Sequence, residues 1–220
     1  RYYNPDNAIL CLAGNIDKET VMPLLNKWFN SIRKKTTKKR SLQPEPEQTE
    51  ERTLIVERDV PYNCIYRVYK MDAAYRDGFI AQDLCSDLLS NGYSSRMYKK
   101  LVSDYKLFSK VSAYQMGHLD PGLFVISGTL NSGVRMDAAV DGIDEVIDEL
   151  CNKEIPEKEL EKVKNKFEAN FIYSHSSMQN IALSCTYFEL LGNLKLINTL
   201  PALYRETTKE EIQAQAKKIF

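Results

Sequence analysis

Histidine is scarce in this chain of 220 residues, which contains only His118 and His175, 57 positions apart. A hydrolytic zinc site needs three protein ligands, and neither histidine belongs to a motif that could supply them. We expect His118, which precedes a turn, to lie in an exposed loop. We expect His175, between Ser174 and Ser176, to be solvated or paired locally. No metal ligand is therefore predicted in this chain.

The chain also lacks a net charge and a long apolar run. Its 30 basic and 30 acidic side chains cancel, so no long-range attraction to nucleic acid or anionic lipid is expected. No apolar run approaches the roughly 18 residues that a membrane-spanning helix needs. Neither a nucleic-acid partner nor a membrane span is predicted.

Paired cysteines are missing as well. The five cysteines are odd in number, far apart and without a C-x-x-C pair, so we predict buried free thiols and no zinc cluster. They are Cys11, Cys64, Cys85, Cys151 and Cys185. Reduced thiols favour the cytoplasm, but a periplasmic protein can also carry them, so the compartment stays open.

The elements that are present follow an order of strands and then helices. Ala8–Ala13 is predicted as a buried strand, followed by a helix that starts near Thr20 with Pro23 in its first turn. Further strands are predicted at Thr53–Glu57, Asn63–Met71, Phe108–Tyr114 and Leu123–Leu130. Helices are predicted from Ile80 to an end at Asn91-Gly92, after a cap at Ser94 or Ser95, over Met136–Leu150, from Pro156, and from the capping box Thr208–Glu211. This order indicates an α+β fold with helices layered on one face of an antiparallel sheet.

A change in charge marks a boundary near residue 40. Arg33–Arg40 is strongly basic, and Glu45–Glu51 is acidic, with Pro44 and Pro46 between or within them. A basic patch for nucleic acid would carry interleaved aromatic residues, and this one has none. We interpret the stretch as a solvated linker, which separates residues 1–40 from residues 41–220.

Several short segments occur in a specific order over nearly the whole chain. They are Tyr3-x-Pro5-Asp6-Asn7-Ala8 with the later Gly14, Val60-Pro61, Asn91–Arg96, Asp120–Gly122, Ile155–Lys164 and Thr207–Glu211. Together they resemble the pitrilysin/insulysin-like zinc metallopeptidases, the inverted zincins. Asn91–Arg96 is similar to the Gly-x-Ser-Ser-Arg turn of that family.

The resemblance implies where this chain lies in a longer protein. In the family, His-x-x-Glu-His supplies two zinc ligands and the residue that activates water, and a third ligand follows on a later helix. All of these precede the Pro-Asp-Asn strand, so the chain would begin downstream of every zinc ligand. Residues 1–40 would be the tail of the zinc-binding domain plus linker, and residues 41–220 the following domain without metal. Zinc is implied for the parent protein and not for this chain.

The resemblance also implies a pair of residues that this chain lacks. In the family's peptide-binding half, an Arg and a Tyr seven residues later contact the substrate carbonyl, and the matching positions here are Val102 and Ser109. Tyr105 and Lys110 offer a phenol and a cation, but their offsets predict different faces. No catalytic residue and no confident substrate-binding residue is predicted.

Two more residues of this segment invite a catalytic interpretation. Arg96 lies beside the glycine turn, and we expect it to pair with a nearby acid or carbonyl and hold that turn. Ser109 has no histidine or acid at triad-like positions nearby in the sequence.

The function that the resemblance implies is a non-catalytic, chamber-forming segment of a zinc metallopeptidase acting on peptides or unfolded proteins. The expected partners are the zinc-binding domain, the opposite half of the clamshell and the peptide substrate. One alternative is a catalytically dead structural or assembly subunit of the same fold, as in respiratory complexes. Another is the peptide-binding half with a diverged Arg and Tyr. The sequence upstream of residue 1 would discriminate among them; the chain alone is not expected to be active.

The resemblance further implies a strand after Phe220, so one edge of the sheet would be open. We predict that Ala8–Ala13 fills this edge, either within the chain or from a second copy in a strand-swapped dimer.

Overall fold

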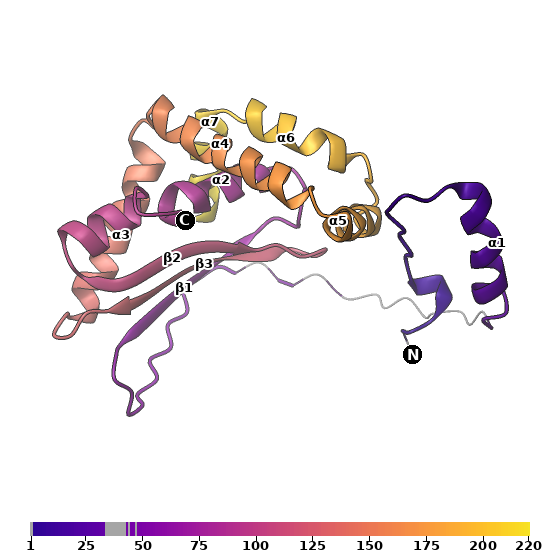
Figure 1. The fold of residues 1–220 in the computed structure, drawn as a ribbon. Coiled ribbons are helices and arrows are strands. Elements are labelled where there is room, and N and C mark those ends of the chain that lie inside the picture. The colour runs from indigo at the N-terminus through magenta and orange to yellow at the C-terminus, as the bar shows by residue number, and fades with distance from the viewer. Residues whose placement is uncertain (1, 34–42, 44, 47) are drawn as a thin grey trace. The chain divides into compact units, whose positions relative to one another are not determined.

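A computed structural model describes residues 2–33, 43, 45–46 and 48–220, and the chain divides into two compact units (Figure 1). Unit 1 contains Arg1–Asp59 and Ser174–Ile197, and unit 2 contains Val60–Tyr173 and Asn198–Phe220. Most of the predicted linker lies outside the described residues. The division into residues 1–40 and 41–220 stays a prediction.

The sheet of unit 2 has three antiparallel strands in the order β1-β3-β2. They are β1 (Cys64–Met71), β2 (Phe108–Met116) and β3 (Gly122–Leu130). The hairpin between β2 and β3 needs a glycine at its turn, because a Cβ on Gly122 would lie 2.3 Å from the carbonyl oxygen of Met116. Three of the predicted strands are thus confirmed.

Helices cover one face of this sheet, as predicted; Figure 1 shows α2, α4 and α7 on one side of it. The helices of this part of the chain are α2 (Phe79–Ser90), α3 (Met136–Asn152), α4 (Glu157–Ser174), α6 (Leu196–Glu206) and α7 (Lys209–Ile219). Phe124 and Ile126 of β3 are fully buried, as are Leu84 and Leu88 of α2. Each such side chain contributes roughly 1.5–3 kcal/mol by leaving water. The fold is therefore α+β.

The last helix, α7, begins at the capping box that the sequence predicts. The Thr208 hydroxyl accepts from the Glu211 N–H (3.2 Å), and the Glu211 carboxylate accepts from the Thr208 N–H (2.8 Å). Beyond the helix, the Phe220 ring packs edge-on against Tyr69 (4.9 Å) and Phe124 (5.3 Å). These contacts anchor the end of α7 on the face of the sheet that the helices cover.

Unit 1 contains the 3-10 turn η1 (Pro5–Asn7), helix α1 (Lys18–Phe29) and helix α5 (Met178–Leu190). Helix α1 begins earlier than predicted, because the carboxylate of Asp17 caps it by accepting from the Thr20 N–H (2.7 Å). Pro23 consequently lies in the second turn instead of the first. None of the residues of α1 is buried: Leu24 is 51% exposed and Trp28 65%.

Two predicted strands are wrong. Ala8–Ala13 and Thr53–Glu57 have no strand structure, and the described residues contain no ladder beyond the three strands of unit 2. A strand needs a hydrogen-bonded neighbour, and β-branched residues alone do not provide one. The prediction that Ala8–Ala13 fills a sheet edge is wrong within the single chain, while a swap between two copies stays a prediction.

The cysteine prediction is confirmed only in part. All five cysteines belong to the described residues and are free thiols, but only Cys85 and Cys151 are buried. Cys11 and Cys185 are half-buried, and Cys64 is exposed. The exposure of Cys64 follows from its place on β1, where alternate side chains point away from the helices.

In the described part of the chain, no helix combines the length and the apolar character that crossing a membrane requires.

Candidate functional site

The segment Asn91–Ala113 forms a turn, a helix and strand β2. Gly92 has a φ of 93°, which a residue with a side chain rarely adopts. The helix η2 (Tyr98–Asp104) is a π-helix, a form that is rare and often marks a functional position. No serine caps it: the buried hydroxyl of Ser95 has no partner among the described residues, and that of Ser94 accepts from Lys162 (3.1 Å). The serine cap is therefore a wrong prediction.

The two positions of the missing Arg and Tyr lie on different elements. Val102 is half-buried on η2, and Ser109 is exposed at the start of β2. The pairing of β2 with β3 shifts between Phe108 and Lys110, so Ser109 sits in a bulge, where its hydroxyl donates to the Thr129 carbonyl (3.1 Å). Neither side chain brings a cation or a phenol to these positions.

Arg96 makes a two-pronged ion pair with Glu159 in the first turn of α4. Its Nε and one terminal nitrogen donate to the two carboxylate oxygens, at 3.0 and 2.8 Å. Only 14% of the Arg96 side chain and 17% of the Glu159 side chain are exposed. Arg96 thus fastens the glycine turn to α4, as the structural interpretation predicts.

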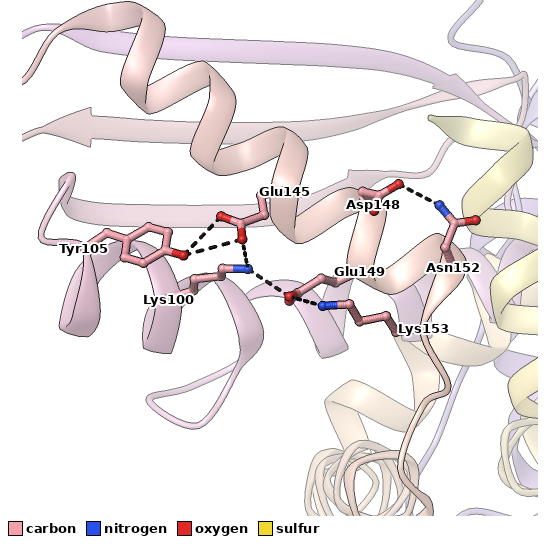
Figure 2. Close-up of polar contacts among 7 residues, drawn as sticks. All are labelled: Lys100, Tyr105, Glu145, Asp148, Glu149, Asn152 and Lys153. Carbon is pink, nitrogen blue, oxygen red and sulfur yellow. Dashed lines mark hydrogen bonds and ion pairs between the residues drawn. The ribbon is translucent and has the colours of Figure 1, made fainter.

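Tyr105 and Lys100 belong to an ionic network between η2 and α3, drawn in Figure 2. The Tyr105 hydroxyl donates to Glu145 (3.2 Å), and the Lys100 ammonium lies between Glu145 (2.7 Å) and Glu149 (2.9 Å). Hydrogen bonds from Lys153 and Lys100 lower the pKa of Glu149, so its carboxylate is ionised at neutral pH. The network holds η2 against α3.

Lys110 lies on the opposite side of the sheet from Tyr105. Lys110 lies opposite Thr129 in the β2–β3 pairing, and both side chains point away from the helices. Tyr105 instead contacts α3. The two side chains are therefore on different faces, as expected from their offsets, and cannot act together on one carbonyl.

Neither histidine lies in a metal-binding cluster. His118 is exposed in the loop before the β2–β3 turn, and His175 is half-buried with Nδ1 3.1 Å from the Ser174 hydroxyl. Among the described residues, no group of three histidine, cysteine or acidic side chains is arranged to hold a metal ion.

A shallow cavity of about 440 Å³ lies between α3 and α7. Its lining residues are Asp144, Ile147, Asp148, Cys151, Asn152, Lys217 and Phe220. Burial raises the pKa of the Cys151 thiol, which keeps it in the unreactive protonated form. The cavity therefore lacks an activated nucleophile.

The candidate functional surface is the face of the sheet that points away from the helices, here called the outer sheet face. The strand register and the alternation of side chains place on it Cys64, Tyr66, Val68, Lys70, Lys110, Ser112, Tyr114, Met116, Leu123, Val125, Ser127 and Thr129. Tyr66 is 68% exposed and Val68 53%, and the surface contains lysines but no acid. The strands β1 and β2 each present one edge without a partner among the described residues. Such a surface suits an extended, apolar peptide.

Sequence reasoning missed this surface, although a signal was present. Tyr66 and Val68 alternate with Ile65 and Arg67 in a strand that was correctly predicted. Apolar residues occur at both the even- and the odd-numbered positions of this strand, which point to opposite faces of the sheet. The sequence alone therefore does not indicate which face the helices cover.

Comparisons with known proteins agree with the α+β architecture. A family model described as the peptidase M16 inactive domain matches residues 1–167. The zinc protease PqqE of Helicobacter pylori is 30% identical over 184 residues, which are 82% of this chain and 41% of that protein. YmxG of Bacillus subtilis, described as an uncharacterized zinc protease, is 23% identical over 220 residues, covering 100% of this chain and 53% of that protein.

Solved structures show the same fold. The crystal structure of a protease from Helicobacter pylori matches with a TM-score of 0.90 and 26% sequence identity, over 100% of this chain and 54% of that chain. The present chain therefore spans about half the length of the proteins that it matches, or less.

Proposed function

This chain belongs to the peptidase M16 family, in the part that the family model describes as inactive, and from this premise we propose that it is a chamber-forming segment of a zinc metallopeptidase. Residues 1–40 are the tail of the zinc-binding domain plus a linker, and residues 41–220 are the following domain. The zinc and the residues that cleave peptides lie elsewhere in the parent protein. The chain itself supplies structure and a surface for the substrate.

The observation that carries this proposal is the uncovered apolar side of the N-terminal segment. Ile9 and Leu10 before α1 are exposed, and so are Leu24, Trp28 and Phe29 of α1. An amphipathic helix buries its apolar stripe against a core, and exposed apolar side chains at this density mark an interface. The zinc-binding domain of the parent is the partner that completes this core.

The outer sheet face supports the proposal that this chain supplies a surface for the substrate. Its two middle rows carry the apolar and aromatic side chains of Tyr66, Val68, Val125 and Tyr114 beside Ser112 and Ser127, and Lys70 and Lys110 lie in the two outer rows. Among the described residues, β1 and β2 each have one edge without a partner strand. An extended peptide can pack on such a surface and add hydrogen bonds at an edge. We infer that this face forms part of the chamber wall.

The positions of Val102 and Ser109 support placing this domain in the same half as the zinc. A carbonyl-polarising Arg and Tyr are then supplied by the opposite half, which closes around the peptide. Zinc is bound by the parent and not by this chain.

Trp28 offers a direct test, because it is the only tryptophan in the chain and 65% of it is exposed. Acrylamide quenching of Trp28 fluorescence is measured in this chain and in the full-length protein, where a Trp28→Phe variant isolates its signal. We expect strong quenching in the chain and clear protection in the full-length protein. Equal quenching in both would refute the assignment of residues 1–40.

Zinc analysis and peptide cleavage complete the test. We expect the full-length protein to bind zinc and to cleave peptides, and this chain alone to do neither. Chelator-sensitive hydrolysis by the chain alone would overturn the non-catalytic assignment. Protection of Trp28 in a full-length protein without zinc or activity would instead indicate the structural or assembly subunit.

A further inference from the structure

Two of the five cysteines, Cys11 and Cys185, meet in unit 1, and no function described above uses them. Cys11 lies in the segment between η1 and α1, and Cys185 lies in α5. Their side chains are in hydrogen-bonding contact, and Figure 1 shows the two segments next to each other. The fold thus creates a thiol pair that the wide spacing of the cysteines in the sequence does not reveal.

The other three cysteines, all in unit 2, are placed differently. Cys85 and Cys151 are 0% and 8% exposed, and the Cys85 thiol donates to the carbonyl of Ile212 (3.4 Å). Both belong to the core, where a dissolved oxidant does not reach them. Cys64 is exposed on β1, and the described partner of its sulfur is the Thr129 hydroxyl (3.8 Å). Among the described residues, contact between two thiols and access from solvent therefore coincide at Cys11 and Cys185.

Both thiols of this pair are free and only half-buried. Burial, and next to it the Cys11 thiol, raise the pKa of Cys185, so that Cys185 is mostly protonated at neutral pH. A protonated thiol reacts slowly, through its small thiolate fraction. The pair consequently stays reduced until a disulfide oxidant is present.

We propose that Cys11 and Cys185 are a redox site, whose two thiols form a disulfide in the presence of a low-molecular-weight disulfide such as oxidised glutathione. One cysteine attacks the small disulfide as a thiolate, forms a mixed disulfide and releases the first small thiol. The second cysteine attacks the protein sulfur of that mixed disulfide and releases the second small thiol. The two cysteines together lose two electrons and two protons, and these reduce the small disulfide to two thiols.

The disulfide would join the segment before α1 to α5 and close a long covalent loop. Such a loop stabilises the folded chain because it restricts the unfolded one. Residues 1–40 are, in the proposed function, the tail of the zinc-binding domain, so the bond would also tie that tail to the following domain. This last consequence rests on the proposed function, whereas the formation of the bond does not.

Mass spectrometry of the whole chain tests the proposal after incubation with oxidised glutathione and non-reducing trypsin digestion. We expect peptide 2–18, which contains Cys11, linked to peptide 167–195, which contains Cys185, and the link should disappear with dithiothreitol. Cys64→Ser is the matched control, because it removes the exposed thiol of unit 2 and should keep the link. Thiol titration of this variant should show a fall from four thiols to two. Cys11→Ser should lose the link.

Urea unfolding gives a second readout that a chance encounter of two thiols would not move. The oxidised chain should unfold at a higher urea concentration than the reduced chain, in the wild type and in Cys64→Ser, and Cys11→Ser should show no such shift. Glutathione attached to Cys11 or Cys185 without a link between them, or a link only between two chains, would overturn the proposal. Quenching of Trp28 tests the proposed function separately, so the two can fail independently.

Discussion

Replacing Arg96 with Met should destabilise the chain by about 2–3 kcal/mol. Breaking a buried ion pair costs about 3–5 kcal/mol, and an exposed pair contributes about 0–1 kcal/mol. The Arg96–Glu159 pair lies between these limits, because it is bidentate and its side chains are 14% and 17% exposed. Met keeps the apolar stem of Arg96 but leaves the Glu159 carboxylate without its partner, and this unpaired charge accounts for most of the loss.

Urea unfolding followed by circular dichroism measures this effect. The matched control is Arg135→Met, whose partner Asp137 forms a pair with side chains 81% and 57% exposed, and no measurable change is expected there. Adding Glu159→Gln to Arg96→Met should restore part of the lost stability, since it removes the unpaired charge. If Arg96→Met costs no more than Arg135→Met, the ion pair does not hold the glycine turn.

Two further predictions concern the sheet. Gly128→Ala should destabilise unit 2 by about 1–3 kcal/mol in the same unfolding assay, because the new Cβ would lie 2.5 Å from the buried Phe108 ring; an unchanged midpoint would contradict this packing. On the outer sheet face, Tyr114→Lys in the full-length protein should raise KM for apolar peptides and leave kcat nearly unchanged. Tyr93→Lys, at an exposed position outside the sheet, is its control, and equal KM values in both variants would count against the chamber wall.

Local sequence signals predicted those elements whose partners are close in the chain. The Thr208–Glu211 capping box needs only residues three positions apart, and the β2–β3 hairpin needs only its turn. In both cases the interacting residues are close in the sequence, so a single local turn brings them into contact. For Arg96, the sequence predicted a structural pairing with an acid or a carbonyl without identifying Glu159, 63 positions later.

Predictions failed where the deciding partner is distant or lies outside the described chain. Thr53–Glu57 has strand-forming residues but no neighbouring strand, and Leu54 is 85% exposed. Residues that favour a strand form one only when a neighbouring strand supplies hydrogen bonds that offset the lost chain entropy.

The sequence by itself determined the α+β class and the order of most elements, because these depend on periodicity and on turn and cap residues that act locally. The order of its short motifs pointed to the family by resemblance. Its two isolated histidines also indicated, without a structure, that neither belongs to a zinc-binding motif. Only the tertiary structure decided which face of the sheet is open, that Tyr105 serves an ionic network with α3, and that Arg96 pairs with Glu159. The physical reason is that burial and electrostatic environment are properties of groups far apart in the chain, which meet only after folding.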